Sequence, residues 1–322
     1  MKNRERERFT DPSIKYKIKA MENNKEVQDR LASVREEMKS RTLSILNYKK
    51  LLIIGMVIFT LSIAGFIDDA FSSLIIIGGA VYLYKSFKEK QKLNDNAYAD
   101  NFLLPVLREI LPETEITYGK GLKIKVLSNF LPDEEYFSGN CHIKFGDEFG
   151  TEFSNFAAYH YTTDSDDNKK RVIDFVGQGL FIKMPTNING HIRIVPTIRK
   201  SVFGNKKHGI YGKKETDEME IETESIDFNE SYSIYSTDDF YTRLILDPNI
   251  IDLLNSWKDR MDVIVYMNEE YISIAFKSNE YIFETPITNM EVDKLSLSSE
   301  YEKVREKLVD FYSLIDIIKS KL

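Results

Sequence analysis

The chain has 322 residues, 42% of them hydrophobic and 30% charged, which is enough for about two folded domains and excludes a wholly disordered protein. Its single cysteine, Cys141, excludes an internal disulfide and a thiolate metal cluster. Residues 1–50 carry a net charge of +6, so the rest of the chain must carry −13 to give the total of −7. Such an acidic body argues against nucleic acid as the main partner.

The N-terminal segment, residues 1–48, begins with a stretch dense in charge, which predicts disorder over residues 1–20. Between residues 22 and 48, apolar side chains recur at helical intervals and are separated by Glu, Lys and Arg. This pattern predicts an amphipathic helix. Either the helix contacts a membrane or a partner helix, or it is a solvated helix that leads into the next segment.

Two apolar runs in residues 49–88 predict a transmembrane helical hairpin. The first run, Leu51–Ile67, has no charged residue and would span roughly 26 Å as a helix, close to the hydrocarbon thickness of a bilayer. The second run, Phe71–Tyr84, is shorter. Asp68 and Asp69 lie between the runs and would be costly inside a bilayer, so they are predicted to form the turn.

Lysines flank the outer ends of both runs, whereas the turn holds only acids. This distribution of positive charge predicts a multi-pass protein of the cell inner membrane, with both termini in the cytoplasm and the lipid bilayer as a partner. The alternative is a buried helical hairpin of a soluble protein, which the all-round apolar character of the runs disfavours.

Residues 95–290 differ in composition: segments rich in Phe, Tyr, Ile and Thr alternate with Gly, Asn and Asp, which is typical of strands and turns. Strands are predicted at Tyr136–Phe145, Thr151–Tyr161, Arg171–Lys183, Gly190–Pro196, Glu218–Thr223, Ser231–Ile234, Asp262–Met267, Glu270–Lys277 and Tyr281–Glu284. Helices are predicted at Ala97–Ile110, Asp238–Leu246 and Pro248–Asp259.

The C-terminal segment, residues 291–322, is predicted to be an amphipathic helix that Ser298 or Ser299 caps and that packs on the sheet. The predicted fold class is therefore α+β: a two-helix transmembrane hairpin plus a strand-rich cytoplasmic domain with flanking helices.

The residue types that carry catalysis or bind metal are dispersed along the chain. Its histidines do not pair at ligand spacing, so neither a metal site nor a cofactor site is predicted. Cys141 and His142 would face opposite sides of a strand, which is poor geometry for a nucleophile and its base, although His160 or His191 could approach from another strand. Acid pairs such as Asp133–Glu134 lie in turn-like sequence.

Two glycine-containing segments are of interest. Gly177 and Gly179 lack the third glycine and the following helix of a phosphate loop, and indicate a bulge or a close backbone approach within a strand. The segment Ser201–Lys214 predicts a mobile basic loop, which either contacts a membrane surface or a partner or is a flexible hairpin kept in solution by its lysines. These lysines are Lys206, Lys207, Lys213 and Lys214.

The order of the segments resembles a known family. A charged start and the predicted hairpin precede Gly139, the Glu152–Phe153–Ser154 triplet, Gly177 with Phe181, and the Ser236–Thr237–Asp238 turn before Leu246–Pro248. In this order they resemble the bacterial membrane family known as domain of unknown function number 3137, over about residues 95–290 and the hairpin. The resemblance implies no activity, cofactor or catalytic residue; it implies a LemA-like membrane-associated protein as a partner.

With no catalytic signature, the chain is predicted to be a membrane-anchored binding or scaffold protein rather than an enzyme. The alternative is a membrane-bound hydrolase whose site gathers polar residues from distant strands. The hydrolase requires a deep polar cleft that holds at least two of five side chains. These are His142, His160, His191, Asp147 and Asp238.

Overall fold

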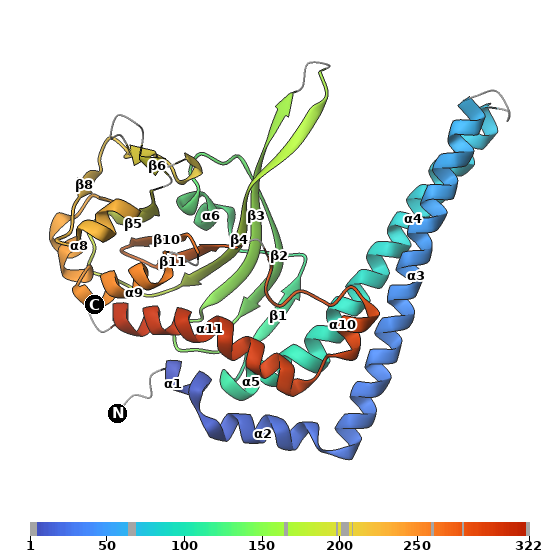
Figure 1. Ribbon diagram of the computed structural model, residues 1–322, viewed down its shortest axis with the longest axis horizontal. Coiled ribbons are helices and arrows are strands. Elements are labelled where there is room, and N and C mark those ends of the chain that lie inside the picture. Colours follow the sequence, from blue (N-terminus) through green and yellow to red (C-terminus); the bar gives the residue numbers. More distant parts are fainter. Residues whose placement is uncertain are drawn as a thin grey trace. The chain divides into compact units, whose positions relative to one another are not determined.

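The computed structural model describes residues 5–63, 69–163, 167–197, 199–200, 206–207, 209–258, 261–278 and 280–319 (Figure 1). The chain divides into two compact units, each built from segments that are distant in sequence. The helical unit comprises Pro12–Val106 and Thr285–Lys303. The sheet unit comprises Met1–Asp11, Leu107–Glu284 and Val304–Leu322.

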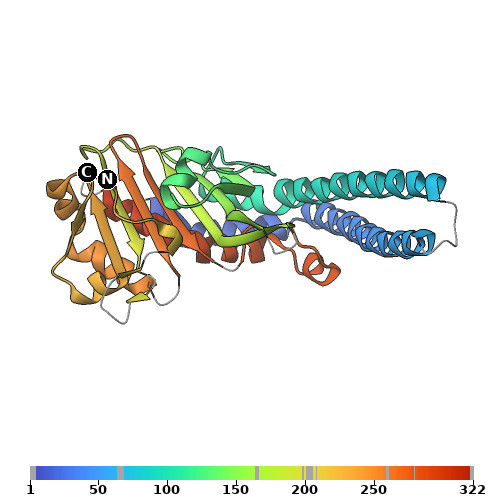
Figure 2. The same ribbon diagram turned by 90° about the horizontal axis from the view of Figure 1, so that it is seen from above.

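Two long helices dominate the helical unit. Helices α3 (Lys25–Ile63) and α4 (Asp69–Tyr98) lie side by side and run in opposite directions (Figures 1 and 2). The buried side-chain amide of Asn94 donates a hydrogen bond to the carbonyl oxygen of Met38 at 3.3 Å and so links the two helices. The unit also contains α2 (Pro12–Glu22), the π-helix η1 (Ala99–Leu103) and α10 (Asn289–Asp293).

The predicted transmembrane hairpin is wrong. In the part of the chain that the structure describes, no helix is both long and apolar enough to cross a membrane. The multi-pass inner-membrane localisation drawn from the hairpin is overturned with it, and Asp68 of the predicted turn lies outside the described residues.

Residues 5–10 and 12–22 are helical, so the disorder predicted for residues 1–20 is wrong over its described part; residues 1–4 lie outside the described residues. In the sheet unit, α1 (Glu5–Thr10) buries Phe9, whose ring lies 4.7 Å from that of Tyr312. In the helical unit, α2 buries Ile18, and Lys15 forms an ion pair with Glu302 at 2.7 Å. Apolar anchors therefore order a segment that its charge density alone would leave unfolded.

A large antiparallel sheet organises the sheet unit. Among the described residues, nine strands form it in the order β1-β2-β3-β4-β11-β10-β5-β9-β8. Their bounds are β1 Glu115–Tyr118, β2 Tyr136–Lys144, β3 Glu152–Thr163, β4 Lys169–Ile182, β5 His191–Pro196, β8 Met219–Ile221, β9 Tyr232–Ser236, β10 Val263–Asn268 and β11 Ile272–Lys277. The predicted strands are confirmed except Tyr281–Glu284, which is irregular, and β1 was missed.

Helices cover the sheet. They are α6 (Ile124–Phe130), α7 (Ile226–Ser231), α8 (Asp239–Ile245), α9 (Pro248–Trp257) and the part of α11 (Leu297–Lys319) that belongs to this unit; α5 (Leu104–Ile110) precedes β1. The side chains of successive residues in β11 point to opposite faces of the sheet. Ala275 joins the core under α6, whereas Phe276 stacks on Phe311 of α11.

The helix ends follow local sequence. The Asp247 carboxylate accepts hydrogen bonds from two backbone N–H groups of α9, and Pro248 occupies its first position, as predicted. The amphipathic C-terminal helix is confirmed as α11, but its cap is Ser296 rather than Ser298 or Ser299. The Ser296 hydroxyl oxygen accepts a hydrogen bond from the backbone N–H of Ser299 at 2.9 Å.

Gly139 of β2 approaches Gly121 so closely that neither position has room for a side chain. A Cβ atom on Gly139 would lie 2.5 Å from Cα of Gly121, and backbone atoms cannot rotate away. We expect Gly139→Ala to lower the free energy of unfolding by about 1–3 kcal/mol. Urea unfolding, followed by the fluorescence of the single tryptophan, Trp257, measures it because that side chain is buried in the same unit.

Gly78 provides the control for this substitution. A Cβ atom there meets nothing within 4 Å, so Gly78→Ala is expected to leave the tryptophan transition unchanged. A loss below about 0.5 kcal/mol for Gly139→Ala would contradict the close approach of the two glycines.

Candidate functional site

The three described histidines named in the hydrolase hypothesis lie apart from one another. Each pairs with a different carboxylate: His142 with Glu152 at 2.9 Å, His160 with Asp174 at 2.5 Å, and His191 with Glu218 at 2.8 Å. His208 lies outside the described residues.

The two aspartates of the hypothesis have separate roles. Asp147 accepts a hydrogen bond from the hydroxyl of Tyr312 at 3.0 Å, and Asp238 caps α8 by accepting from the backbone N–H of Tyr241. None of the five side chains lines either of the two grooves described below. Neither of these two grooves is therefore the polar cleft that the hydrolase requires.

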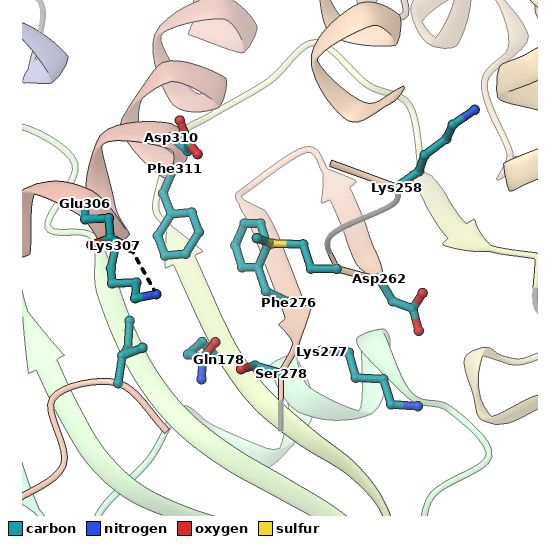
Figure 3. Close-up of a pocket in the computed structure, with 12 residues that line it drawn as sticks. Gln178, Lys258, Asp262, Phe276, Lys277, Ser278, Glu306, Lys307, Asp310 and Phe311 are labelled. Atoms are coloured by element: carbon teal, nitrogen blue, oxygen red, sulfur yellow. Dashed lines mark ion pairs between the residues drawn. The ribbon is translucent and has the colours of Figure 1, made fainter. Parts of the chain in front are cut away.

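An open groove of about 710 Å³ lies in the sheet unit, between α11 and the region where β4 meets β11 (Figure 3). Its floor is aromatic: the rings of Phe276 and Phe311 stack with centroids 4.1 Å apart. Trp257 packs against Phe276 at 5.7 Å, edge to face, and supports this floor. The volume falls within the roughly 300–1,000 Å³ of ligand-binding pockets.

Charged side chains of both signs surround the aromatic floor (Figure 3). The acids and lysines that line the groove are equal in number: Asp262, Glu306, Asp310, Lys258, Lys277 and Lys307. Lys307 lies 3.5 Å from Glu306 and is about half exposed, so its charge faces the solvent at the rim. A groove with an apolar floor and a balanced rim suits an amphipathic ligand that carries both charges.

A second groove, of about 560 Å³, lies where β8, α8 and α9 meet. Four acids line it against one basic residue, Arg243, so its charge is one-sided: Glu222, Glu224, Asp247 and Asp252. The Asp247 carboxylate is already engaged in capping α9. The first groove combines an apolar floor with solvent-facing charge and is therefore the better candidate site.

A buried ion pair holds the segment that follows the basic loop. Arg193 of β5 donates from Nε and Nη2 to the carboxylate of Glu218 at 2.7 and 2.9 Å. Burial alone would raise the pKa of Glu218, but hydrogen bonds from Arg193, from His191 and from the backbone N–H of Glu215 lower that pKa to about 2. Arg193 also donates to the backbone carbonyl of Lys213, so the pair fixes this segment to the sheet.

The four lysines of the predicted basic loop lie in two places. Lys206 and Lys207 form strand β7, which pairs with β6 (Arg199–Lys200) in a small ribbon. Lys213 and Lys214 are exposed beyond it. The ammonium group of Lys214 donates to the backbone carbonyl of Glu218 at 2.9 Å. Contact of this loop with an anionic surface or a partner remains a prediction.

Sequence reasoning did not find the surroundings of His160. Glu134, from the turn after α6, and Asp174, from β4, both lie beside His160 of β3. Burial, together with repulsion from Asp174, raises the pKa of Glu134 to about 7. Sequence motifs do not reveal this cluster, because its residues come from three separate elements.

The described fold is that of a protein with a large antiparallel sheet flanked by helices. Residues 173–320 match the model of the family described as Protein of unknown function (DUF3137), which confirms the resemblance. The match contains Gly177, Phe181 and the Ser236–Thr237–Asp238 turn, whereas Gly139 and the Glu152–Phe153–Ser154 triplet precede it.

The other comparisons add little. No curated protein matches the chain. The crystal structure of the mycobacterial trehalose monomycolate transport factor A, TtfA, is similar at 11% identity with a TM-score of 0.34, over 68% of this chain and 94% of that chain. This likeness is too low to carry an argument about function.

Proposed function

We propose that the chain is a protein-binding module, and that the groove beside α11 receives a segment of the partner. The observation that carries the proposal is the stacked floor of Phe276 and Phe311 within a rim of balanced charge. Buried aromatic anchors surrounded by polar rims are the usual centres of protein interfaces. The partner segment would lie over this buried ring stack and place charges of both signs at the rim.

The separate engagement of the histidines supports a binding role over catalysis. His142, His160 and His191 each contact a different carboxylate. A LemA-like protein, which the family resemblance implies as a partner, is the first candidate for the groove.

Charge reversal at Lys307 tests the proposal. The side chain lines the groove and is about half exposed, so Lys307→Glu should leave the fold intact. The variant places a third acid beside Glu306 and Asp310, and we expect the affinity for the partner to fall about tenfold or more. Biolayer interferometry of the full chain with a purified LemA-like protein measures this affinity.

A photo-crosslinking amino acid at position 307 identifies the partner independently, because it captures in living cells whatever occupies the groove. Arg305→Glu is the matched control: it reverses a charge on the exposed part of the same helix, and Arg305 is not among the lining residues. Equal loss of affinity in both variants, or a crosslink only to unrelated abundant proteins, would reject the groove as the binding site.

A further inference from the structure

Three side chains with metal-ligating atoms meet beside the hairpin of β3 and β4. The carboxylates of Glu134 and Asp174 and a ring nitrogen of His160 all lie within 4.8 Å of one another. Local sequence positions Glu134: its backbone N–H donates to the carbonyl of Leu131 at 3.1 Å and closes a turn. Pro132 follows Leu131 at the position where turns of this kind favour proline.

A β-bulge brings Asp174 to the same place. Ala158 pairs with Phe175, but the next residue of β3, Tyr159, pairs with Ile173, so Asp174 is the extra residue of β4. Bulges bend a strand and redirect side chains, and they are frequent next to functional sites. Here the bulge leaves an Asp174 oxygen 2.5 Å from Nδ1 of His160.

Glu134 provides a second and independent indication of a ligand. Its side chain belongs to a residue that is only 9% exposed, and its Oε2 atom has no hydrogen-bond partner. An unsatisfied buried carboxylate oxygen is costly and needs an explanation. Asp133 is adjacent in the chain and its charge adds to the repulsion on Glu134, so the site favours a cation.

We propose that Glu134, His160 and Asp174 bind one divalent transition-metal ion, for which Zn²⁺ is the best match. One imidazole nitrogen and two carboxylate oxygens are common Zn²⁺ ligands, and a water molecule completes the four-coordinate shell. Bonds of about 2.1 Å place such ligand atoms roughly 3.4 Å apart. The ion therefore replaces the direct contact between His160 and Asp174, and small side-chain rotations bring the three groups around it.

Metal titration of the full chain tests the site. After treatment with a chelator, isothermal titration with Zn²⁺ alone is expected to show one ion per chain, and Mg²⁺ is expected to bind at least 100-fold more weakly. Asp174→Asn and Glu134→Gln keep the shape of the side chains but weaken the ligands, so each should reduce Zn²⁺ affinity tenfold or more. X-ray absorption should show nitrogen and oxygen ligands with one imidazole.

The pair of His142 and Glu152 provides a matched control. It also joins a histidine and a carboxylate across neighbouring strands, at 2.9 Å, but it does not belong to the three-residue cluster. His142→Gln should therefore leave Zn²⁺ affinity unchanged. A stoichiometry well below one, undiminished binding in folded Asp174→Asn, or sulfur from Cys141 among the ligands would overturn the proposal. Intact Trp257 fluorescence verifies that each variant is folded.

Discussion

Replacing Phe156 by alanine is expected to lower the free energy of unfolding of the sheet unit by about 3–5 kcal/mol. The Phe156 ring is fully buried and stacks on Phe175, with ring centroids 4.9 Å apart. It also lies 6.2 Å from the ring of Phe130 on α6. Gly179 makes space for the ring, since a Cβ atom there would lie 3.2 Å from Phe156. Alanine would therefore leave a cavity between β3, β4 and α6.

Urea unfolding followed by Trp257 fluorescence measures this loss, because the indole is buried in the same unit. Phe156→Leu refills part of the cavity and should cost only about 1–1.5 kcal/mol. Phe240 is 71% exposed, so Phe240→Ala should change the stability by less than about 0.5 kcal/mol. A Phe156→Ala loss as small as that of Phe240→Ala would show that α6 does not close over the sheet.

Much of the sheet could be predicted because its signals are local. The hairpin of β10 and β11 depends on Asn268, whose side-chain oxygen accepts hydrogen bonds from the backbone N–H groups of Glu270 and Tyr271 at 3.0 Å. Because Asn favours turns of this kind, the sequence alone predicts the turn. Strand β1 was missed because Glu115–Tyr118 has only four residues, too few to establish an alternating pattern.

The glycines of β4 could also be interpreted from the sequence. A Cβ atom on Gly177 would lie 2.0 Å from the carbonyl oxygen of Phe276, which confirms the predicted close backbone approach. A Cβ atom on Gly179 would contact Leu122, Phe156 and Phe130. The sequence indicated a lack of space but not which neighbours cause it, since those neighbours come from other elements.

The transmembrane prediction failed because none of the described helices is both long enough and apolar enough to cross a membrane. In the structure, Leu51 lies within a helix that begins at Lys25, and Tyr84 lies within one that continues to Tyr98. A local hydropathy signal does not reveal the length of the helix that contains it or the helix beside it.

The candidate sites depend on contacts between distant parts of the chain. Phe311 could be placed on the apolar face of the C-terminal helix, but its stacking on Phe276 follows only from the packing of that helix on β11. The sequence offers His160 as a possible base for Cys141. In the fold, a β-bulge brings Asp174 into contact with His160, and no short sequence motif predicts that bulge. Residue type was therefore enough to select candidate site residues, but the register of the strands determines which side chains they contact.

Replacing Glu218 by glutamine is expected to lower the free energy of unfolding by about 3–5 kcal/mol, because it leaves a buried guanidinium without its counter-charge. The Glu218 side chain is fully buried and that of Arg193 is 4% exposed. Arg193 would keep only neutral acceptors, among them the carbonyls of Tyr211 and Lys213. Urea unfolding followed by Trp257 fluorescence measures this loss of stability.

A double substitution separates the ion pair from simple packing. Arg193→Met with Glu218→Leu removes both charges, so it should cost less than either Arg193→Met or Glu218→Leu alone. Arg243→Gln breaks an exposed pair with Asp239 and should change stability by less than about 1 kcal/mol. If the double variant lost the sum of both single losses, the two charges would not stabilise one another.

The pH dependence of stability provides the decisive measurement for Glu218. Its pKa is near 4.5 in the unfolded chain and about 2 in the folded chain, so the folded state favours the ionised form. The corresponding stability is fully present above about pH 4.5 and is lost as the pH falls towards 2, a change of about 3 kcal/mol. Other carboxylates titrate in the same range, but the difference between the wild-type chain and Glu218→Gln isolates this one. That difference should shrink progressively below pH 4.5, and a difference that stays constant between pH 6 and pH 2 would contradict the lowered pKa.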